Sequence, residues 1–287
     1  MSILMCVPRF LWKLGLFSLI RFIFPHSIFS YLYYLVWFVF LDPMMWQGIG
    51  QIFGGVYAEV FYRSKLPSKS NYICKADYIL PFSGKWTVAN GGVDRRMSHS
   101  WSVISQRYAY DFIIVDEEGK SYSGNNKSVK NYYCYGNDII APADGVVVKI
   151  SSKHKDSRVN GRKAYCDTWD IRGNFVVIKH NEREYSLIAH LAPNSIMVNV
   201  GDTVNQSDVI AKCGNTGNTS EPHIHFQLQS GKSFFTSVGL PISFSYVNAL
   251  EKTPQWQREN RSRQTEPEIV DGVNKIYIGR GLEVVNT

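Results

Sequence analysis

Two histidines separated by a single residue, His223 and His225, are the residues of this sequence best suited to chemistry. They follow a loop rich in glycine, asparagine and threonine (214–219) and precede an apolar run. Alternate side chains of a β-strand point to the same face, so both imidazoles would face one point. Neutral imidazoles bind zinc, and a catalytic zinc normally has three protein ligands and an open water position. The pair therefore indicates half of a zinc site, the alternative being an ordinary pair of hydrogen-bonded strand histidines.

Two residues upstream are candidates to complete such a site. Asp111 lies inside the aromatic run 108–112, and His190 ends the run 185–190, which also has the composition of a strand. Carboxylate oxygens and imidazole nitrogens are both common zinc ligands. A carboxylate, a third histidine and the His-x-His pair together are far more specific than the pair alone.

The order of these motifs resembles that of the lysostaphin-like zinc metallopeptidases, which cut peptide cross-links in bacterial cell walls. The resemblance runs roughly from Asp111 to Leu228. It rests on the motifs above and on three further segments: the Pro-Ala-Asp-Gly-Val strand entry at 141–147, the strand 174–180 and the hairpin 200–204.

The resemblance implies a role for each residue of the site. Asp111 and His225 would bind zinc (Zn2+), and His190 and His223 would be unligated histidines beside the metal-bound water. Zinc lowers the pKa of bound water to about 7, which provides a hydroxide that attacks a peptide carbonyl. An imidazole that titrates near neutrality can take and return the proton and can hydrogen-bond the oxyanion.

One position departs from the family pattern. The family usually has its first zinc-binding histidine four residues before the aspartate, where this chain has Arg107. Arginine stays protonated and cannot bind zinc. A subset of the family has Gln-Arg-aromatic-Ala-aromatic-Asp with a histidine upstream, and residues 106–111 follow that pattern. We therefore expect His99 to be the third ligand, with an ordinary loop histidine as the alternative.

Short β-branched and aromatic runs separated by Gly, Asn and Asp turns fill the region from Trp101 to Leu228. This pattern predicts a mainly β fold, and the family implies an antiparallel β-sheet groove of the lysostaphin-like (duplicated hybrid motif) type. The expected strands are 108–115, 145–151, 175–180, 185–190, 209–212 and 223–229. We place the peptidase domain at 77–250, with the polar insertion 152–172 beside the substrate.

The first 62 residues are strongly aromatic and apolar, which predicts a helical membrane-associated segment over 1–62. The uncharged stretch 27–41 is shorter than the roughly 20 residues that span a bilayer unless it continues through Trp46. Arg9, Lys13 and Arg21 precede it and would keep the N-terminus in the cytoplasm and the peptidase outside. A signal peptide, interfacial amphipathic helices and a helical hairpin are the alternatives.

The remaining segments are polar. Residues 63–76 have the composition of a linker, and 251–287 form a polar C-terminal extension. The net charge of +7 suits an anionic cell wall or membrane surface. Basic residues are mixed with acidic ones and no nucleic-acid motif is present, so we expect no nucleic-acid partner. The sequence does not indicate an oligomeric state.

These observations predict a zinc endopeptidase in the cell membrane whose extracytoplasmic domain hydrolyses peptide cross-links in peptidoglycan. The main alternative is a catalytically inactive domain of the same fold that binds cell wall or activates another hydrolase, and Arg107 is the residue that favours it. A structural metal domain, in which protein atoms fill all four zinc positions, is a third interpretation.

Overall fold

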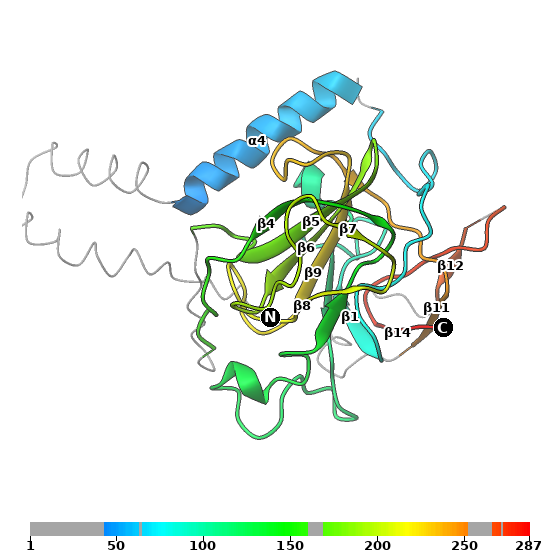
Figure 1. Ribbon diagram of the computed structural model, residues 1–287. Coiled ribbons are helices and arrows are strands. Elements are labelled where there is room, and N and C mark those ends of the chain that lie inside the picture. The colour runs from blue at the N-terminus through cyan, green and yellow to red at the C-terminus, as the bar shows by residue number, and fades with distance from the viewer. Residues whose placement is uncertain (1–42, 63–64, 160–168, 252–265, 271) are drawn as a thin grey trace, which may run out of the picture.

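The computed structural model describes residues 43–62, 65–159, 169–251, 266–270 and 272–287 (Figure 1). The main element among them is one antiparallel sheet of ten strands. Its strands, in spatial order, are β11 (Val247–Glu251), β14 (Leu282–Asn286), β1 (Trp86–Asn90), β2 (Tyr110–Ile113), β9 (Ile224–Gln229), β6 (Glu184–Leu191), β5 (Asn174–Asn181), β4 (Gly145–Ser151) and β7 (Thr203–Val204), and β10 (Gly239–Leu240) pairs with β9. The predicted mainly β, antiparallel fold is therefore confirmed for the described residues.

The strand bounds are close to those expected from the sequence pattern. Strands β4 and β8 (Val209–Lys212) have the expected limits, and the other expected strands differ by one or two residues at their ends.

Smaller elements complete the described part of the chain. Two short sheets pair β3 with β8 and β12 with β13. Their strands are β3 (Asp138–Ile140), β8 (Val209–Lys212), β12 (Glu268–Ile269) and β13 (Ile276–Tyr277), and the helical elements are α4 (Pro43–Tyr62), η1 (Ile104–Gln106) and η2 (Val129–Asn131).

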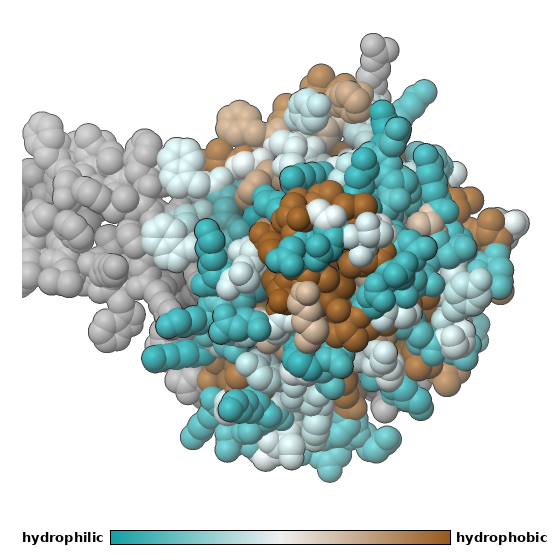
Figure 2. Space-filling model, viewed as in Figure 1, coloured by the Kyte–Doolittle hydropathy of each residue, from teal (hydrophilic) through white to brown (hydrophobic). Residues whose placement is uncertain are grey.

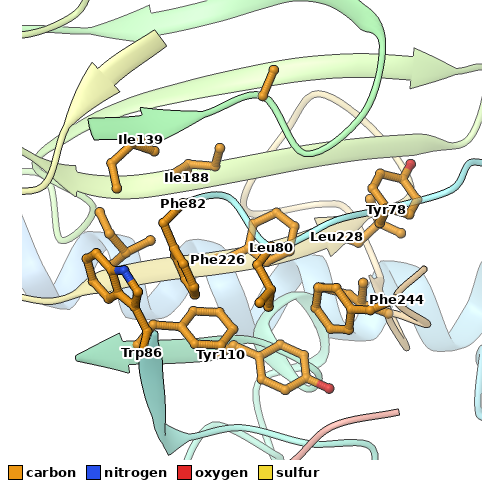
Figure 3. Packing of buried hydrophobic residues seen from close by; sticks show 14 of the residues in the cluster. Tyr78, Leu80, Phe82, Trp86, Tyr110, Ile139, Ile188, Phe226, Leu228 and Phe244 are labelled. Atoms are coloured by element: carbon orange, nitrogen blue, oxygen red, sulfur yellow. The ribbon is translucent and has the colours of Figure 1, made fainter. Parts of the chain in front are cut away.

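The main core is formed by aromatic and aliphatic side chains from one face of the large sheet and from the segment 78–86 (Figure 3). Phe82 stacks on Trp86 and meets Phe112 edge to face, with ring centroids 4.4 and 4.9 Å apart. Tyr110 stacks on Phe112 at 5.6 Å. Because Tyr110 and Phe112 both point into this core, the residue between them, Asp111, points to the opposite face.

Helix α4 packs on the sheet domain through small residues. A Cβ atom on Gly54 would lie only 1.6 Å from the carbonyl oxygen of Phe235, so any larger residue would displace the helix. Ala58 is buried next to Ile104 and Val238. Because this side of the helix lies so close to the sheet domain, it has small residues, Gly54 and Ala58, four positions apart.

The other side of α4 exposes large apolar side chains. Phe53 and Val60 are 71% and 73% exposed, and Figure 2 shows hydrophobic side chains along this helix at the upper edge of the molecule. Within the described residues, no helix has both the length and the apolar character needed to cross a membrane. Residues 1–42, which hold most of the predicted membrane segment, lie outside the described residues.

Both segments that flank the predicted domain pack against it. Tyr72 and Tyr78 donate hydrogen bonds to the buried Glu184 carboxylate at the start of β6. At the other end of the chain, β14 lies between β11 and β1 in the large sheet. Tyr72 of the expected linker and β14 of the expected C-terminal extension thus contact the rest of the sheet domain, and the domain bounds stay a prediction.

Candidate metal centre

Asp111 lies at the centre of a cluster of histidines on one face of the sheet. Strands β2 and β9 are neighbours, and their register places Asp111 opposite His225. The Nδ1–H of His225 donates to Asp111 Oδ1 at 3.1 Å. Nε2 of His223 is 3.8 Å from the same oxygen, and Nδ1 of His99 is 3.6 Å from Oδ2. Residues more than 100 positions apart in sequence thus meet at one carboxylate.

His99 reaches this cluster from the loop between β1 and η1. Asn90, at the end of β1, accepts a hydrogen bond from the backbone N–H of His99 at 3.1 Å. The same amide donates to Asp111 Oδ2 at 3.2 Å. Asn90 therefore links the loop to the carboxylate, a role that its position in the sequence did not indicate.

His190 faces the cluster from β6, next to β9. Its ring centroid lies 4.6 Å from that of His223 and 5.9 Å from that of His225. Its backbone φ is +64°, in the left-handed region that a residue with a Cβ rarely adopts. Its Nδ1–H donates to the carbonyl oxygen of Thr216 at 2.7 Å, which leaves Nε2 as the nitrogen with a lone pair.

The glycine-rich loop, residues 214–219, holds the His190 and His223 rings in place. A Cβ on Gly173 would lie 2.3 Å from the carbonyl carbon of Thr216, so the two chain segments touch at the backbone. Just after this loop, the Nδ1–H of His223 donates to the carbonyl oxygen of Glu221 at 2.8 Å. In both His190 and His223 a backbone carbonyl fixes the ring and leaves Nε2 without its proton when the ring is neutral.

Burial and charge shift the pKa values in this cluster in opposite directions. Burial by itself would raise the pKa of Asp111, but the hydrogen bond from His225 and the other nearby imidazoles hold it well below its usual value. Burial lowers the pKa of His190 well below its ordinary value, and charge on His223 and His225 adds to this effect. The cluster therefore contains an ionised carboxylate next to a neutral histidine.

The donor atoms fit zinc in type, and two of their separations are close to those between ligands of one zinc ion. Two atoms bound to one tetrahedral zinc at about 2.1 Å are about 3.4 Å apart, and the Asp111 oxygens lie 3.1 Å from His225 and 3.6 Å from His99. A cation between them would take the place of the proton on His225 Nδ1. Among the described residues, however, no group of three or more His, Cys, Asp or Glu side chains is arranged so that it could hold a metal ion without some movement.

Arg107 is directed away from the histidines. Its Nε–H donates to the carbonyl oxygen of Trp101 at 3.2 Å, and its guanidinium lies 5.3 Å from the centre of the Trp101 ring. His180 also lies outside the cluster, because its two ring nitrogens contact the Asp144 carbonyl and the Ser186 hydroxyl. The five histidine and aspartate residues singled out by sequence are thus together, and Arg107 is not among them.

Comparison with known proteins identifies the region that carries three of these histidines. Residues 124–236 match peptidase family M23. This chain contains an M23 peptidase domain. The matched residues include His190, His223 and His225, whereas Asp111 and His99 precede them.

Two curated relatives each match a little under half of this chain. An uncharacterized metalloprotease of Haemophilus influenzae is 28% identical over 129 residues, which are 44% of this chain and 24% of that protein. The murein hydrolase activator NlpD of Salmonella dublin is 31% identical over 137 residues, 47% of this chain and 31% of that protein. The match thus spans about a quarter to a third of the length of these relatives.

Solved structures of M23 peptidases are more distant. The catalytic domain of lysostaphin from Staphylococcus simulans is 18% identical and covers 55% of this chain and 88% of its own, with a TM-score of 0.31. The family assignment therefore depends on the sequence match and not on this likeness.

Proposed function

We propose that this protein is a membrane-attached zinc endopeptidase that hydrolyses peptide cross-links in bacterial peptidoglycan. The observation that carries the proposal is the meeting of His99, His223 and His225 at the Asp111 carboxylate, with His190 beside them. Its presence in a chain with an M23 peptidase domain supports a hydrolytic role for this cluster.

In this proposal His99, Asp111 and His225 hold the zinc. Bound zinc supplies a Lewis acid and a hydroxide near neutral pH. His190 and His223 are the proton carriers, because hydrogen bonds from their Nδ1 atoms to backbone carbonyls leave Nε2 free to accept a proton. The low pKa of His190 keeps its ring neutral and ready for that task. Once protonated, either ring can donate to the oxyanion of the tetrahedral intermediate.

The membrane attachment and the extracytoplasmic position are part of the same proposal. The apolar, aromatic sequence of residues 1–42 leads directly into α4, and α4 exposes Phe53, Val56 and Val60 to solvent. Exposed apolar side chains at this spacing form one continuous stripe along the helix, which favours contact with lipid. Basic residues before the longest uncharged stretch favour a peptidase domain outside the cytoplasm.

A second function is supported by a specific observation. Relatives 31% identical to this chain are named murein hydrolase activators, and Arg107 stands where the family usually has a zinc-binding histidine. A domain of this kind would bind cell wall without cutting it, or would activate another hydrolase. The histidine cluster favours the enzyme over this alternative.

Incubation of the full-length protein with purified peptidoglycan tests the proposal. We expect soluble fragments whose masses show cleavage within the peptides, loss of this activity with a zinc chelator, and recovery when zinc is returned. His180→Asn is the control variant, because this histidine lies outside the cluster, and it should retain activity. Peptidoglycan that binds the protein but stays intact, with faster digestion once a separate murein hydrolase is added, would support the activator instead.

A further inference from the structure

The inner side of helix α4 contacts a segment that leads to the histidine cluster. The helix lies along the outside of the sheet domain (Figure 1), and Gln47 is near its start. Gln47 Oε1 accepts a hydrogen bond from the backbone N–H of Ile171 at 2.9 Å, and its Nε2 donates to the carbonyl oxygen of Trp169 at 3.4 Å. Gln47 thus bonds a backbone donor and a backbone acceptor of segment 169–173, which directly precedes β5.

Segment 169–173 in turn holds the backbone around His190. The carbonyl oxygen of Ile171 accepts from the backbone N–H of Asn218, in the glycine-rich loop, at 2.9 Å. The carbonyl oxygen of Arg172 accepts from the backbone N–H of His190 at 3.0 Å. Ile171 is therefore bonded to α4 through its N–H and to the glycine-rich loop through its carbonyl, and the next residue is bonded to His190.

The segment and the glycine-rich loop touch at the backbone, so a displacement of one must move the other. A Cβ on Gly217 would lie 2.4 Å from the backbone nitrogen of Gly173. Close-packed atoms leave no space that could absorb a shift of the segment. The Thr216 carbonyl that fixes the His190 ring belongs to the same loop. The ring and the backbone of His190 would therefore both follow the shift.

Helix α4 also acts on this segment through the side chain of Arg172. The buried Arg172 guanidinium forms an ion pair with Asp170 at 2.7 Å and lies 5.8 Å from the centre of the Phe235 ring. On the other side of that ring is the helix, since a Cβ on Gly50 would lie 3.2 Å from a Phe235 ring carbon. The helix thus supports the segment at two places, and a single substitution of similar shape removes the Gln47 contact.

We propose that Gln47 is a positioning residue that, through segment 169–173, holds His190 and the glycine-rich loop in place, so that turnover depends on the docking of α4. The inference rests on the proposed function for the reaction at His190, but the coupling between helix and histidine is a property of the fold alone. Gln47 has no contact with substrate in this account and acts only through the backbone of Trp169 and Ile171.

The first test is hydrogen–deuterium exchange of the full-length protein, measured in peptides that contain the backbone N–H groups of His190 and Asn218. Gln47→Met has a side chain of similar length without the amide. We expect faster exchange in these peptides in Gln47→Met and unchanged exchange in β14, because the opening is local. Unchanged exchange at both His190 and Asn218 would overturn the inference.

Two further variants control this test. Glu59→Met introduces the same residue at an exposed position of the same helix, and its exchange should match that of the native protein. Gln47→Ala removes the same amide with the best helix-forming residue and should give the pattern of Gln47→Met. Faster exchange in Glu59→Met than in Gln47→Met would contradict a specific role of the Gln47 amide.

The second test is the rate of peptide release at saturating peptidoglycan (kcat), measured together with KM and zinc content. We expect Gln47→Met to lose about 10–100-fold in kcat and to keep its zinc and its KM, because a misplacement of about 1 Å has an effect of this size. Gln47→Glu keeps an acceptor for the Ile171 N–H, so it should lose less. A native kcat in Gln47→Met, or equal losses in Gln47→Met and Gln47→Glu, would contradict the positioning role.

The two tests separate the inference from the proposed function. A native protein without peptidase activity, whose exchange at His190 depends on Gln47, would contradict the zinc enzyme and support the coupling. An active native protein whose kcat and exchange are the same in Gln47→Met would leave the enzyme in place and contradict the coupling.

Discussion

Asp111 and Glu184 are two carboxylates of the same sheet that differ in the groups around them. Both are largely buried, and both have a pKa held below the ordinary value although burial by itself would raise it. Glu184 accepts hydrogen bonds from neutral groups: the Tyr72 and Tyr78 hydroxyls, the Asn181 amide and two backbone N–H groups. Asp111 is surrounded mainly by imidazoles.

The difference separates a structural carboxylate from a functional one. Hydroxyl and amide donors satisfy Glu184 permanently and tie the segment before β1 to the hairpin of β5 and β6. Imidazole nitrogens can lose their protons and bind a metal in their place. A carboxylate with little exposure thus stabilises the fold at Glu184 and forms part of a candidate reaction centre at Asp111.

Replacing Asp111 should have the largest effect on function. We expect Asp111→Ala to lose both bound zinc and peptidoglycan hydrolysis, because its carboxylate is the point at which the histidines meet. Metal analysis and release of soluble fragments measure the two losses. Glu184→Gln is the control and should retain both, so loss of zinc in Glu184→Gln would break the distinction between the carboxylates.

Replacing a proton carrier should affect turnover without affecting the metal. We expect His190→Ala and His223→Ala to keep zinc and to lose about 10²–10⁴-fold in rate, the usual contribution of a general acid or base. The rate of peptide release at saturating peptidoglycan, together with zinc content, measures this separation. Full activity in His190→Ala would rule out the role assigned to it.

Replacing Glu184 should reduce stability instead. Glu184→Gln places an amide nitrogen among donors that are directed at an oxygen, so we expect the free energy of unfolding to fall by about 1–3 kcal/mol. Urea unfolding at neutral pH measures the change. An unchanged midpoint and slope would show that this buried carboxylate does not stabilise the fold.

The same variant should have a flatter dependence of stability on pH. The pKa of Glu184 in the folded protein lies below its ordinary value of 4.5, so its stabilising contribution is complete above pH 4.5 and is lost as the pH falls through the lower folded value. The difference in unfolding free energy between native protein and Glu184→Gln should therefore shrink below pH 4.5. A difference that stays constant with pH would contradict the assignment.

The sequence predicted the strands and the histidines of the site better than the hydrogen bonds that hold them. Alternation placed His223 and His225 on one face, and the β-branched runs gave strands such as 145–151. The hydrogen bonds from the Asn90 amide to Asp111 and from His190 to the Thr216 carbonyl were not predictable, since polar residues of these types occur in many turns and strands. The positive φ of His190 depends on contact with the glycine-rich loop, which is a tertiary effect. The position of β14 within the sheet also required tertiary pairing between distant segments.

The measurement that tests the central claim most directly is zinc content and peptidoglycan hydrolysis on one preparation of the full-length protein, with His99→Ala prepared in parallel. We predict about one zinc per native chain together with cleavage, and the loss of both in His99→Ala. Native protein that carries no zinc and cleaves nothing, even when zinc is supplied, would contradict the enzyme and leave an inactive domain that binds cell wall or activates another hydrolase.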